Sequence, residues 1–305
     1  MVPFFLGIDG GGTKTRCILG DESSQLGTGT SSSCRVQKVG EACARDALSA
    51  AIHEACVQAG VSPRQIARTC GGITGAARPE IAGVMRDLIA SVAGGEIEVV
   101  GDIEIAYQDA FGDAAGVIVI AGTGAIVYGR NDAGATARAS GWGPAVSDEG
   151  SGYWIGAQAV RSALHGRDRD ENSGLLPDLI AALGAKDFEE FIVQVNATPT
   201  PDFSVLFPVV LSSAEKGNVV ARDILDLAGR ALATSAEVVI QKLFAGKSCP
   251  VATHGGVFAN STIVRSSFAE KLHALAPESI LLDRALDPAR GALQRARRGH
   301  SLSKA

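Results

Sequence analysis

The first candidate for chemistry is an aspartate at the point where an apolar run enters three consecutive glycines. Residues 4–9 are mainly apolar and end in Asp9, and glycines occupy positions 10–12. A buried strand rarely ends in a carboxylate unless that charge has a partner, such as a hydrated metal ion. Glycines let backbone N–H groups approach a phosphate closely, while Thr13 adds a hydroxyl and Lys14 a positive charge. The segment therefore predicts a nucleoside triphosphate site.

The turn differs from a P-loop in the element on its carboxyl side. The Walker pattern needs an earlier glycine and opens a helix, whereas the segment at residues 16–20, with Ile18 and Leu19, favours a second strand folding back on the first. An ordinary glycine-rich hairpin is the alternative for these residues taken alone.

A second glycine turn comes after another aliphatic strand. Residues 116–121 lead into Gly122, Thr123 and Gly124, and residues 125–130 return. The strand–turn–strand pattern thus occurs twice, about 110 residues apart. The recurrence of this pattern favours a duplicated fold with two phosphate-facing hairpins, although the residues themselves show no long repeat.

Asp102 is the candidate general base. It comes after the expected strand at residues 97–100, so it lies at a carboxyl end, where ligands bind in open α/β sheets. An aspartate there can also cap a helix, and Glu104 is a rival acid on a different helix face. We favour Asp102 as the base.

The densest cluster of unusual residues lies at 141–156, which contains both tryptophans of the chain, Trp142 and Trp154. Aromatic faces beside the carboxylates of Asp148 and Glu149 suit a sugar, which offers apolar C–H faces and hydroxyl donors. Trp154 can instead belong to the core of the next helix.

Near the end of the chain, Gly255 and Gly256 come after a short strand and would let an adenine ring lie against the backbone. A simple glycine turn between strand and helix is the alternative. We interpret His254 as structural and assign Cys249 no role.

Composition limits the remaining possibilities. Hydrophobic residues make up 46% of the 305 positions, the net charge is −5, and length allows two domains. We expect no nucleic acid or membrane partner, because the chain has neither an extended basic patch nor a membrane-spanning run. The six cysteines lack metal-site spacing and suit a reducing compartment, and the first strand leaves no room for a signal peptide, so we expect a cytoplasmic protein.

The hydrophobic patterns predict an α/β protein with helices on mixed sheets. Expected strands are 4–9, 15–20, 25–30, 66–72, 97–100, 116–121, 125–130, 135–140, 250–254 and 279–282; expected helices are 39–59, 79–92, 103–111, 151–164, 219–245 and 288–298, with a less clear helical stretch over 175–208.

The order of these motifs resembles the actin-like sugar kinase superfamily. Within it, the chain is similar to the N-acetylglucosamine kinase branch of the BadF/BadG/BcrA/BcrD ATPase family over nearly its whole length. The most specific match is G-W-G-x-x-x-x-D-E-G-S-x-Y-W-I, which begins at Gly141. Less specific matches lie at 213–218 and 287–292.

The resemblance implies two actin-like (ribonuclease H-like) ATPase domains with a nucleotide cleft between them. The first would span 1–114, completed by the last helix at about 287–305, and the second 115–286. The implied reaction is ATP-dependent phosphorylation of an amino sugar, N-acetylglucosamine first, at the 6-position. We also expect a homodimer.

The resemblance also implies a role for each matching residue. Asp9 would organise Mg²⁺ and Asp102 would take the proton from the sugar hydroxyl. The nucleotide would be held by Gly11, Gly12, Thr13, Lys14, Gly122, Thr123, Gly124, Gly255 and Gly256, and the sugar by Thr123, Gly141, Trp142, Gly143, Asp148 and Glu149.

The chain departs from the family pattern in the loop at 29–37, where members carry a sugar-contacting Asn and this sequence has none. Ser33, Arg35 and Gln37 are the candidates to replace it, which leaves the sugar open. Glucosamine or another hexose is the alternative substrate. An ATPase activator of a 2-hydroxyacyl-CoA dehydratase and a non-catalytic sugar sensor are the alternatives of another class.

Overall fold

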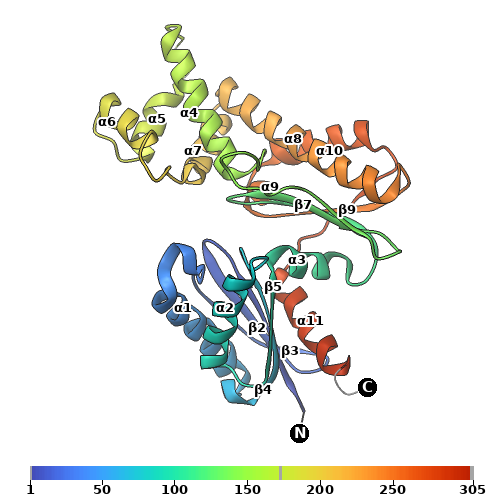
Figure 1. The fold of residues 1–305 in the computed structure, drawn as a ribbon. Helices are drawn as coiled ribbons and strands as arrows, with labels where there is room; N and C mark the ends of the chain where they lie inside the picture. Colours follow the sequence, from blue (N-terminus) through green and yellow to red (C-terminus); the bar gives the residue numbers. More distant parts are fainter. Residues whose placement is uncertain (1, 172–173, 303–305) are drawn as a thin grey trace. The chain divides into compact units, whose positions relative to one another are not determined.

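The computed structural model describes residues 2–171 and 174–302. The chain forms two compact units. The first unit comprises Met1–Asp113 and Ala285–Ala305, and the second comprises Ala114–Arg284. Figure 1 shows that each unit contains a sheet with helices packed on it.

The first unit contains a five-stranded mixed sheet in the order β3-β2-β1-β4-β5. Strands β1 to β3 are antiparallel, and β4 and β5 run parallel to β1. The strands are β1 (Phe4–Gly10), β2 (Lys14–Gly20), β3 (Gln25–Ser32), β4 (Ile66–Ile73) and β5 (Glu96–Gly101). The register places Asp9 of β1 opposite Arg16 of β2 and Gly72 of β4.

Helices cover both faces of this sheet because its strands bury side chains on both sides. Helices α1 (Val36–Ala59) and α2 (Pro79–Val92) pack on one face, while α3 (Asp102–Phe111) and α11 (Pro288–Leu302) pack on the other (Figure 1). On β1, Leu6 and Ile8 face the α1 side and Phe5 faces α11. A short 3₁₀ turn, η1 (Pro63–Gln65), precedes β4.

Helix α11 brings the end of the chain back onto the first sheet. Its Gly291 lies so close to α3 that a Cβ there would be 2.0 Å from the carbonyl oxygen of Ile105. Ala289, Ala292 and Leu293 are buried against Phe5 and other side chains of the sheet. The small residues of α11 thus permit close packing against both α3 and β1.

The second unit contains a sheet with the same arrangement, in the order β10-β9-β6-β7-β8. Here β6 to β8 are antiparallel, while β9 runs parallel to β6 and β10 to β9. The strands are β6 (Gly116–Ala121), β7 (Ala125–Arg130), β8 (Thr136–Ser140), β9 (Pro250–His254) and β10 (Ile280–Leu281). In each unit the strands lie in the spatial order third, second, first, fourth, fifth. This agrees with the predicted duplication, and the α/β class is confirmed.

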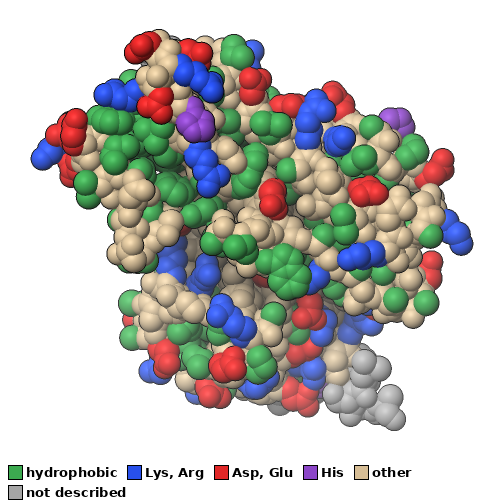
Figure 2. Space-filling view, turned by 45° about the horizontal axis from the view of Figure 1, so that its top comes forward, with side chains coloured by type: hydrophobic (Ala, Val, Ile, Leu, Met, Phe, Trp, Pro, Cys, Tyr) green, Lys and Arg blue, Asp and Glu red, His purple; other side chains and the backbone are tan. Residues whose placement is uncertain are grey.

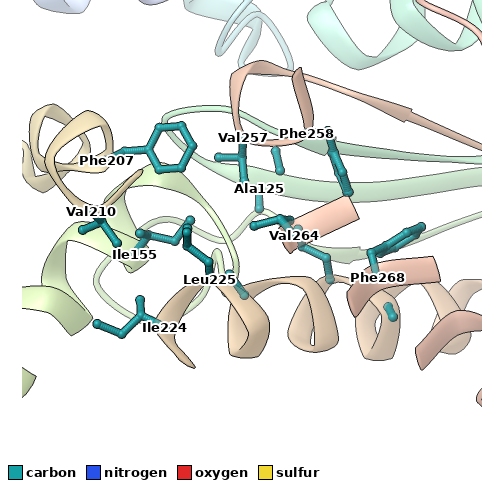
Figure 3. Packing of buried hydrophobic residues seen from close by; sticks show 14 of the residues in the cluster. Ala125, Ile155, Phe207, Val210, Ile224, Leu225, Val257, Phe258, Val264 and Phe268 are labelled. Atoms are coloured by element: carbon teal, nitrogen blue, oxygen red, sulfur yellow. The ribbon is translucent and has the colours of Figure 1, made fainter. Parts of the chain in front are cut away.

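The helices of the second unit share one large core. They are α4 (Gly152–Asp168), α5 (Leu175–Ala182), α6 (Phe188–Val195), η2 (Phe203–Leu206), α7 (Phe207–Glu215), α8 (Val219–Phe244), α9 (Gly256–Asn260) and α10 (Thr262–Leu275). Figure 3 shows Phe207, Leu225 and Val257 from three of these helices within the cluster. The rings of Phe258 and Phe268 meet edge to face, with centroids 5.2 Å apart.

Four element predictions needed correction. The expected helix at 39–59 begins at Val36, the helix at 151–164 continues to Asp168, and the last helix continues to Leu302. The stretch at 175–208 is divided into α5, α6, η2 and the start of α7. Helix α10 had no predicted counterpart. It begins where the Ser261 hydroxyl accepts a hydrogen bond from the Val264 N–H.

The surface carries charges of both signs. Figure 2 shows acidic and basic side chains interspersed over the face in view, with hydrophobic side chains between them. Within the described parts of the chain, no helix has both the length and the apolar character required to cross a bilayer.

Candidate functional site

The first glycine turn joins β1 to β2, and its geometry is tight. The N–H of Gly11 donates to the carbonyl of Lys14 at 3.0 Å, so this amide closes the turn. In the described structure no intramolecular hydrogen bond occupies the N–H groups of Gly12 or Thr13. Thr13 and Lys14 are exposed. The amides and side chains of Gly12, Thr13 and Lys14 are thus the groups of this turn that can meet a phosphate.

Asp9 lies at the end of β1 in an environment that suits a cation. Burial and, to a lesser extent, the negative charge of Asp102 raise the pKa of Asp9 to about 7, and Lys14 opposes this increase. Among the described residues no three acidic, His or Cys side chains gather into a metal cluster. Mg²⁺ needs only one or two carboxylates where phosphates and waters complete its ligands. Asp9 therefore fits that ion.

Asp102 is the first residue of α3, and its carboxylate is held by two hydrogen bonds. The hydroxyl of Thr74 donates to Oδ2 at 2.7 Å, and the N–H of Ile103 donates to Oδ1 at 3.0 Å. The Thr74 N–H in turn donates to the carbonyl of Gly10 at 3.0 Å. Thr74 thus connects the Asp102 carboxylate to the glycine turn, a role that sequence reasoning missed.

The structure also decides whether Asp102 caps its helix, and it shows what the rival acid Glu104 does. The N-cap of α3 is Gly101, so Asp102 is not the cap. Glu104 accepts the N–H of Gly101 at 3.3 Å and pairs with Arg295 at 3.4 Å, which gives this acid a structural role.

The second glycine turn, at residues 122–124, is connected to α4. The N–H of Gly122 donates to the carbonyl of Gly124, which closes the turn. The carbonyls of Gly122 and Thr123 accept N–H groups of Gly152 and Tyr153, at 2.8 and 3.2 Å. The start of α4 therefore fixes the position of this turn.

Asp148 braces the glycine-rich loop. Its side chain is buried, its φ is +68°, and it accepts the N–H of Gly143 at 3.2 Å. A Cβ on Gly124 would lie 2.8 Å from its Oδ2. Burial raises the pKa of Asp148 against the hydrogen bonds from Gly143, Ala125 and Gly141. The carboxylate thus holds the loop and the second turn beside each other.

Trp142 lies on this loop with 68% of its surface exposed. The guanidinium of Arg138 lies 4.0 Å from the ring centroid and also donates to the carbonyl of Gly141 at 2.7 Å. A cation over one face limits the ring orientation. Glu149 is exposed, whereas Trp154 packs on the core of the second unit, as its alternative interpretation predicted.

Gly255 and Gly256 come directly after β9, close to the second turn. Gly255 has a φ of +107°, and a Cβ there would lie 2.3 Å from the carbonyl oxygen of Ala121. No other residue fits this position without movement of the backbone. Gly256 begins α9, and His254 ends β9.

A cavity of about 460 Å³ lies among α7, α8, α9 and α10. Its lining includes Glu215, Arg222, Asn260 and Ile263, and the amide of Asn260 donates to the carbonyl of Gly256 at 2.8 Å. Apolar side chains such as Leu211, Leu225 and Ile263 share the lining with charged and polar ones, so the cavity can accept a ring with polar edges. Of its lining, Ala214 and Glu215 lie in the sequence match at 213–218, while the other residues, on α7 to α10, were not singled out from the sequence.

The structure thus brings the expected residues together in two groups. In the first unit these are Asp9, Gly11, Gly12, Thr13, Lys14 and Asp102. In the second unit hydrogen bonds and close approaches link Gly122, Thr123, Gly124, Gly141, Gly143 and Asp148, while Gly255 and Gly256 lie beside Ala121, and Trp142 and Glu149 occupy the same loop.

The three candidates for the missing Asn differ in their environment. The Ser33 hydroxyl donates to the carbonyl of Gly11 at 2.9 Å, so it braces the turn. Gln37 has its amide nitrogen 3.6 Å from where a Cβ on Gly75 would lie. Arg35 lies beside Gly12, with its Nη1 3.9 Å from a Cβ position there.

Comparison with known proteins decides the family. The sequence matches the BadF/BadG/BcrA/BcrD ATPase family over residues 6–294. The chain belongs to this family. The sequence-based identification is therefore confirmed.

Curated relatives of this BadF/BadG/BcrA/BcrD ATPase family member are sugar kinases. The chain is 33% identical to an N-acetylmuramic acid/N-acetylglucosamine kinase from Clostridium acetobutylicum, over 95% of this chain and 97% of that protein. It is 29% identical to an N-acetyl-D-glucosamine kinase from Dictyostelium discoideum, over 94% and 96% of the two chains.

Solved structures support the same fold. A candidate N-acetylglucosamine kinase from Chromobacterium violaceum superposes with a TM-score of 0.78 at 25% identity, over 96% of this chain and 98% of that chain. A ROK family glucokinase from Streptomyces griseus, solved with glucose and AMPPNP, shares the fold with a TM-score of 0.63 at 16% identity, over 97% and 100%.

Proposed function

We propose that this member of the BadF/BadG/BcrA/BcrD ATPase family transfers the γ-phosphoryl group of ATP to an amino sugar, N-acetylglucosamine first, at its 6-hydroxyl. The observation that carries the proposal is the Asp102 carboxylate. Thr74 holds it at 2.7 Å, and Thr74 is also bonded to Gly10 of the glycine turn that comes after Asp9. A fixed base beside a phosphate-type turn is the arrangement that phosphoryl transfer to an alcohol requires.

In this proposal Asp102 accepts the proton of the sugar hydroxyl as its oxygen attacks the γ-phosphorus. The two hydrogen bonds to the carboxylate fix its orientation, which keeps it aligned for the proton. Asp102 is the better base because Glu104 already accepts a hydrogen bond from Gly101 and forms an ion pair with Arg295.

The phosphate groups are assigned to the two glycine turns. In the first unit the phosphates would meet the amides of Gly12 and Thr13, the hydroxyl of Thr13 and the charge of Lys14. The Gly11 N–H closes this turn. Gly122, Thr123 and Gly124 have the corresponding role in the second unit. Asp9 would hold Mg²⁺, which when bound neutralises the charge of the phosphates.

The sugar and the adenosine are assigned to the second unit. The sugar would be contacted by Thr123 of the second turn and by four residues of the glycine-rich loop, Gly141, Trp142, Gly143 and Glu149. Asp148 holds this loop through the N–H of Gly143. Gly255 and Gly256 would meet the adenosine, and the cavity lined by Asn260 and Glu215 has the size and mixed polarity for the base.

The activator alternative receives no support from the thiols. An iron–sulfur cluster that bridges two subunits needs accessible thiolates. Five of the six cysteines are buried and only Cys43 is exposed.

Two further expectations, that the protein is a homodimer and that it resides in the cytoplasm, stay predictions.

The direct test is a coupled assay of ADP release with ATP, Mg²⁺ and a panel of sugars. The panel includes N-acetylglucosamine, glucosamine, N-acetylmuramic acid and glucose, and phosphorus NMR locates the phosphate on the product. We expect the highest kcat/KM with N-acetylglucosamine and a 6-phosphate product. ADP release no faster with any sugar than without one would overturn the proposed function.

A further inference from the structure

Arg35 has a buried guanidinium donor without a partner. Its Nε is inaccessible to solvent and makes no hydrogen bond in the described structure. Arg35 also forms no ion pair with an acidic side chain of the described residues. Leaving a buried charged donor unsatisfied is costly, so such a group points to a ligand that completes it.

Arg35 is held against the first glycine turn through a short relay. Its backbone N–H donates to the Ser33 hydroxyl at 3.2 Å, and that hydroxyl donates to the carbonyl of Gly11 at 2.9 Å. The Arg35 carbonyl accepts the N–H of Lys38 at 2.8 Å, and Lys38 Nζ donates to the carbonyl of Gly12 at 3.1 Å. The loop on either side of Arg35 is therefore bonded to the turn.

The guanidinium itself lies next to the glycine that is expected to face the phosphates. Nη1 of Arg35 is 3.9 Å from where a Cβ on Gly12 would lie. A planar guanidinium presents several donors at fixed angles and matches the oxygens of a phosphate. With the amides of Gly12 and Thr13, it forms a set of donors for an oxyanion.

We propose that the guanidinium of Arg35 binds the transferring γ-phosphoryl group and stabilises its charge in the transition state. The inference rests on the proposed function. In that step the sugar hydroxyl oxygen forms a bond to the γ-phosphorus, and the hydroxyl proton passes to Asp102. The bond between the γ-phosphorus and the bridging oxygen breaks, and ADP leaves with that electron pair.

A carboxylate on an acidic sugar, such as the lactyl ether of N-acetylmuramic acid, would present the same oxyanion chemistry. The position of Arg35 next to Gly12 favours the phosphoryl group, because this glycine belongs to the turn between β1 and β2 rather than to the glycine-rich loop at 141–156. Removal of Arg35 distinguishes the two ligands. It would change the affinity for AMPPNP relative to ADP if Arg35 binds the phosphoryl group, and only the activity with N-acetylmuramic acid if it binds the sugar carboxylate.

The test compares Arg35→Met and Arg35→Lys with wild type. The matched control is Arg45→Met, which removes the same charge from an exposed position on α1. The first readout is the ratio of the Kd for ADP to the Kd for AMPPNP, both with Mg²⁺. We expect Arg35→Met to lower this ratio about tenfold or more, because only AMPPNP carries the γ-phosphoryl group. Arg45→Met should keep the wild-type ratio.

The second readout is turnover with N-acetylglucosamine. We expect Arg35→Met to lower kcat by about 10²–10³-fold with little change in the KM for the sugar. Arg35→Lys should recover part of kcat, and guanidinium ions should partly rescue Arg35→Met, whereas tetramethylammonium should not. Thermal unfolding checks that each variant is folded. If Arg35→Met does not fold, both readouts are taken from the comparison of Arg35→Lys with wild type.

An unchanged ratio of nucleotide affinities would overturn the proposal. So would loss of activity restricted to N-acetylmuramic acid, which would assign Arg35 to a sugar carboxylate. The nucleotide-binding readout needs no sugar. It therefore tests Arg35 even if the wild-type protein phosphorylates none of the sugars in the panel, an outcome that would overturn only the proposed function.

Discussion

At the residue scale, the charge of Asp9 makes the stability of the metal-free protein depend on pH. Burial and the charge of Asp102 raise the pKa of Asp9 to about 7 in the folded state, against about 4 in the unfolded chain. Between these values the folded state binds more protons, so the free energy of unfolding falls as the pH rises.

We therefore predict that, without Mg²⁺, wild type loses several degrees of Tm between about pH 4 and pH 7 relative to Asp9→Asn. Mg²⁺ with ATP should raise the Tm of wild type more than that of Asp9→Asn, which keeps the glycine turns but lacks the carboxylate for the metal. Calorimetry across this range checks both statements. Parallel Tm profiles for the two proteins would exclude Asp9 as the cause.

Thr74 provides a second test at this scale. Thr74→Val removes the hydroxyl that donates to Asp102 and keeps the shape of the side chain. We expect kcat to fall about tenfold, because the carboxylate loses one of the two hydrogen bonds that orient it. The KM for ATP should stay within about twofold of wild type. Thr69→Val, at a buried hydroxyl on β4 that makes no hydrogen bond in the described structure, is the matched control.

At the element scale, the attachment of α11 to α3 depends on Asp109. The Asp109 side chain is fully buried and accepts two hydrogen bonds from Arg290, at 2.6 and 2.9 Å, and the N–H of Asp287 at 2.8 Å. Asp287 pairs with Arg16 on β2 at 3.0 Å. The first turn of α11 is thus fixed to the helix that begins with Asp102.

We predict that Arg290→Met lowers the free energy of unfolding by about 3 kcal/mol, because it removes a guanidinium and two hydrogen bonds from the buried carboxylate of Asp109. Arg298→Met removes an exposed pair with Asp113 and should cost at most about 1 kcal/mol. Urea unfolding of the two variants measures the difference. Equal losses would show that the Asp109 pair does not hold the helix.

The elements that could be predicted from sequence are those with a strong local signal. The boundaries of α2 at Pro79 and Val92, and of β9 at Pro250 and His254, match the expected ranges because proline and the apolar pattern mark them. Helix α10 was missed because the glycines before it favour a turn, although the Ser261 cap and the spacing of Val264, Phe268 and Leu272 are a helical signal.

At the scale of the whole molecule, the fold of the first unit requires the end of the chain. Ala289, Ala292, Leu293 and Ala296 bury side chains in the cluster with Phe5. We predict that a chain ending at residue 284 loses the cooperative unfolding of the first unit and exposes this apolar face. Hydrogen exchange in β1 and binding of a hydrophobic dye measure this. Native protection of β1 in the truncated chain would contradict the prediction.

The candidate site could be predicted from sequence only where one residue type is required at one position. Asp9 and Asp102 stand out at strand ends, and Gly255 occupies a position with a φ of +107°. Contacts between distant segments gave no local signal. The Thr74 hydrogen bond to Asp102 and the relay from Ser33 to Gly11 join residues that lie 28 and 22 positions apart.

The role of Asp102 as the base of a sugar kinase is measured most directly by the turnover of Asp102→Asn with ATP and N-acetylglucosamine. The amide keeps the size of the side chain and cannot take the proton. We predict that kcat falls by about 10²–10⁴-fold while the Kd for ATP stays close to that of wild type. Turnover near the wild-type rate would contradict the account.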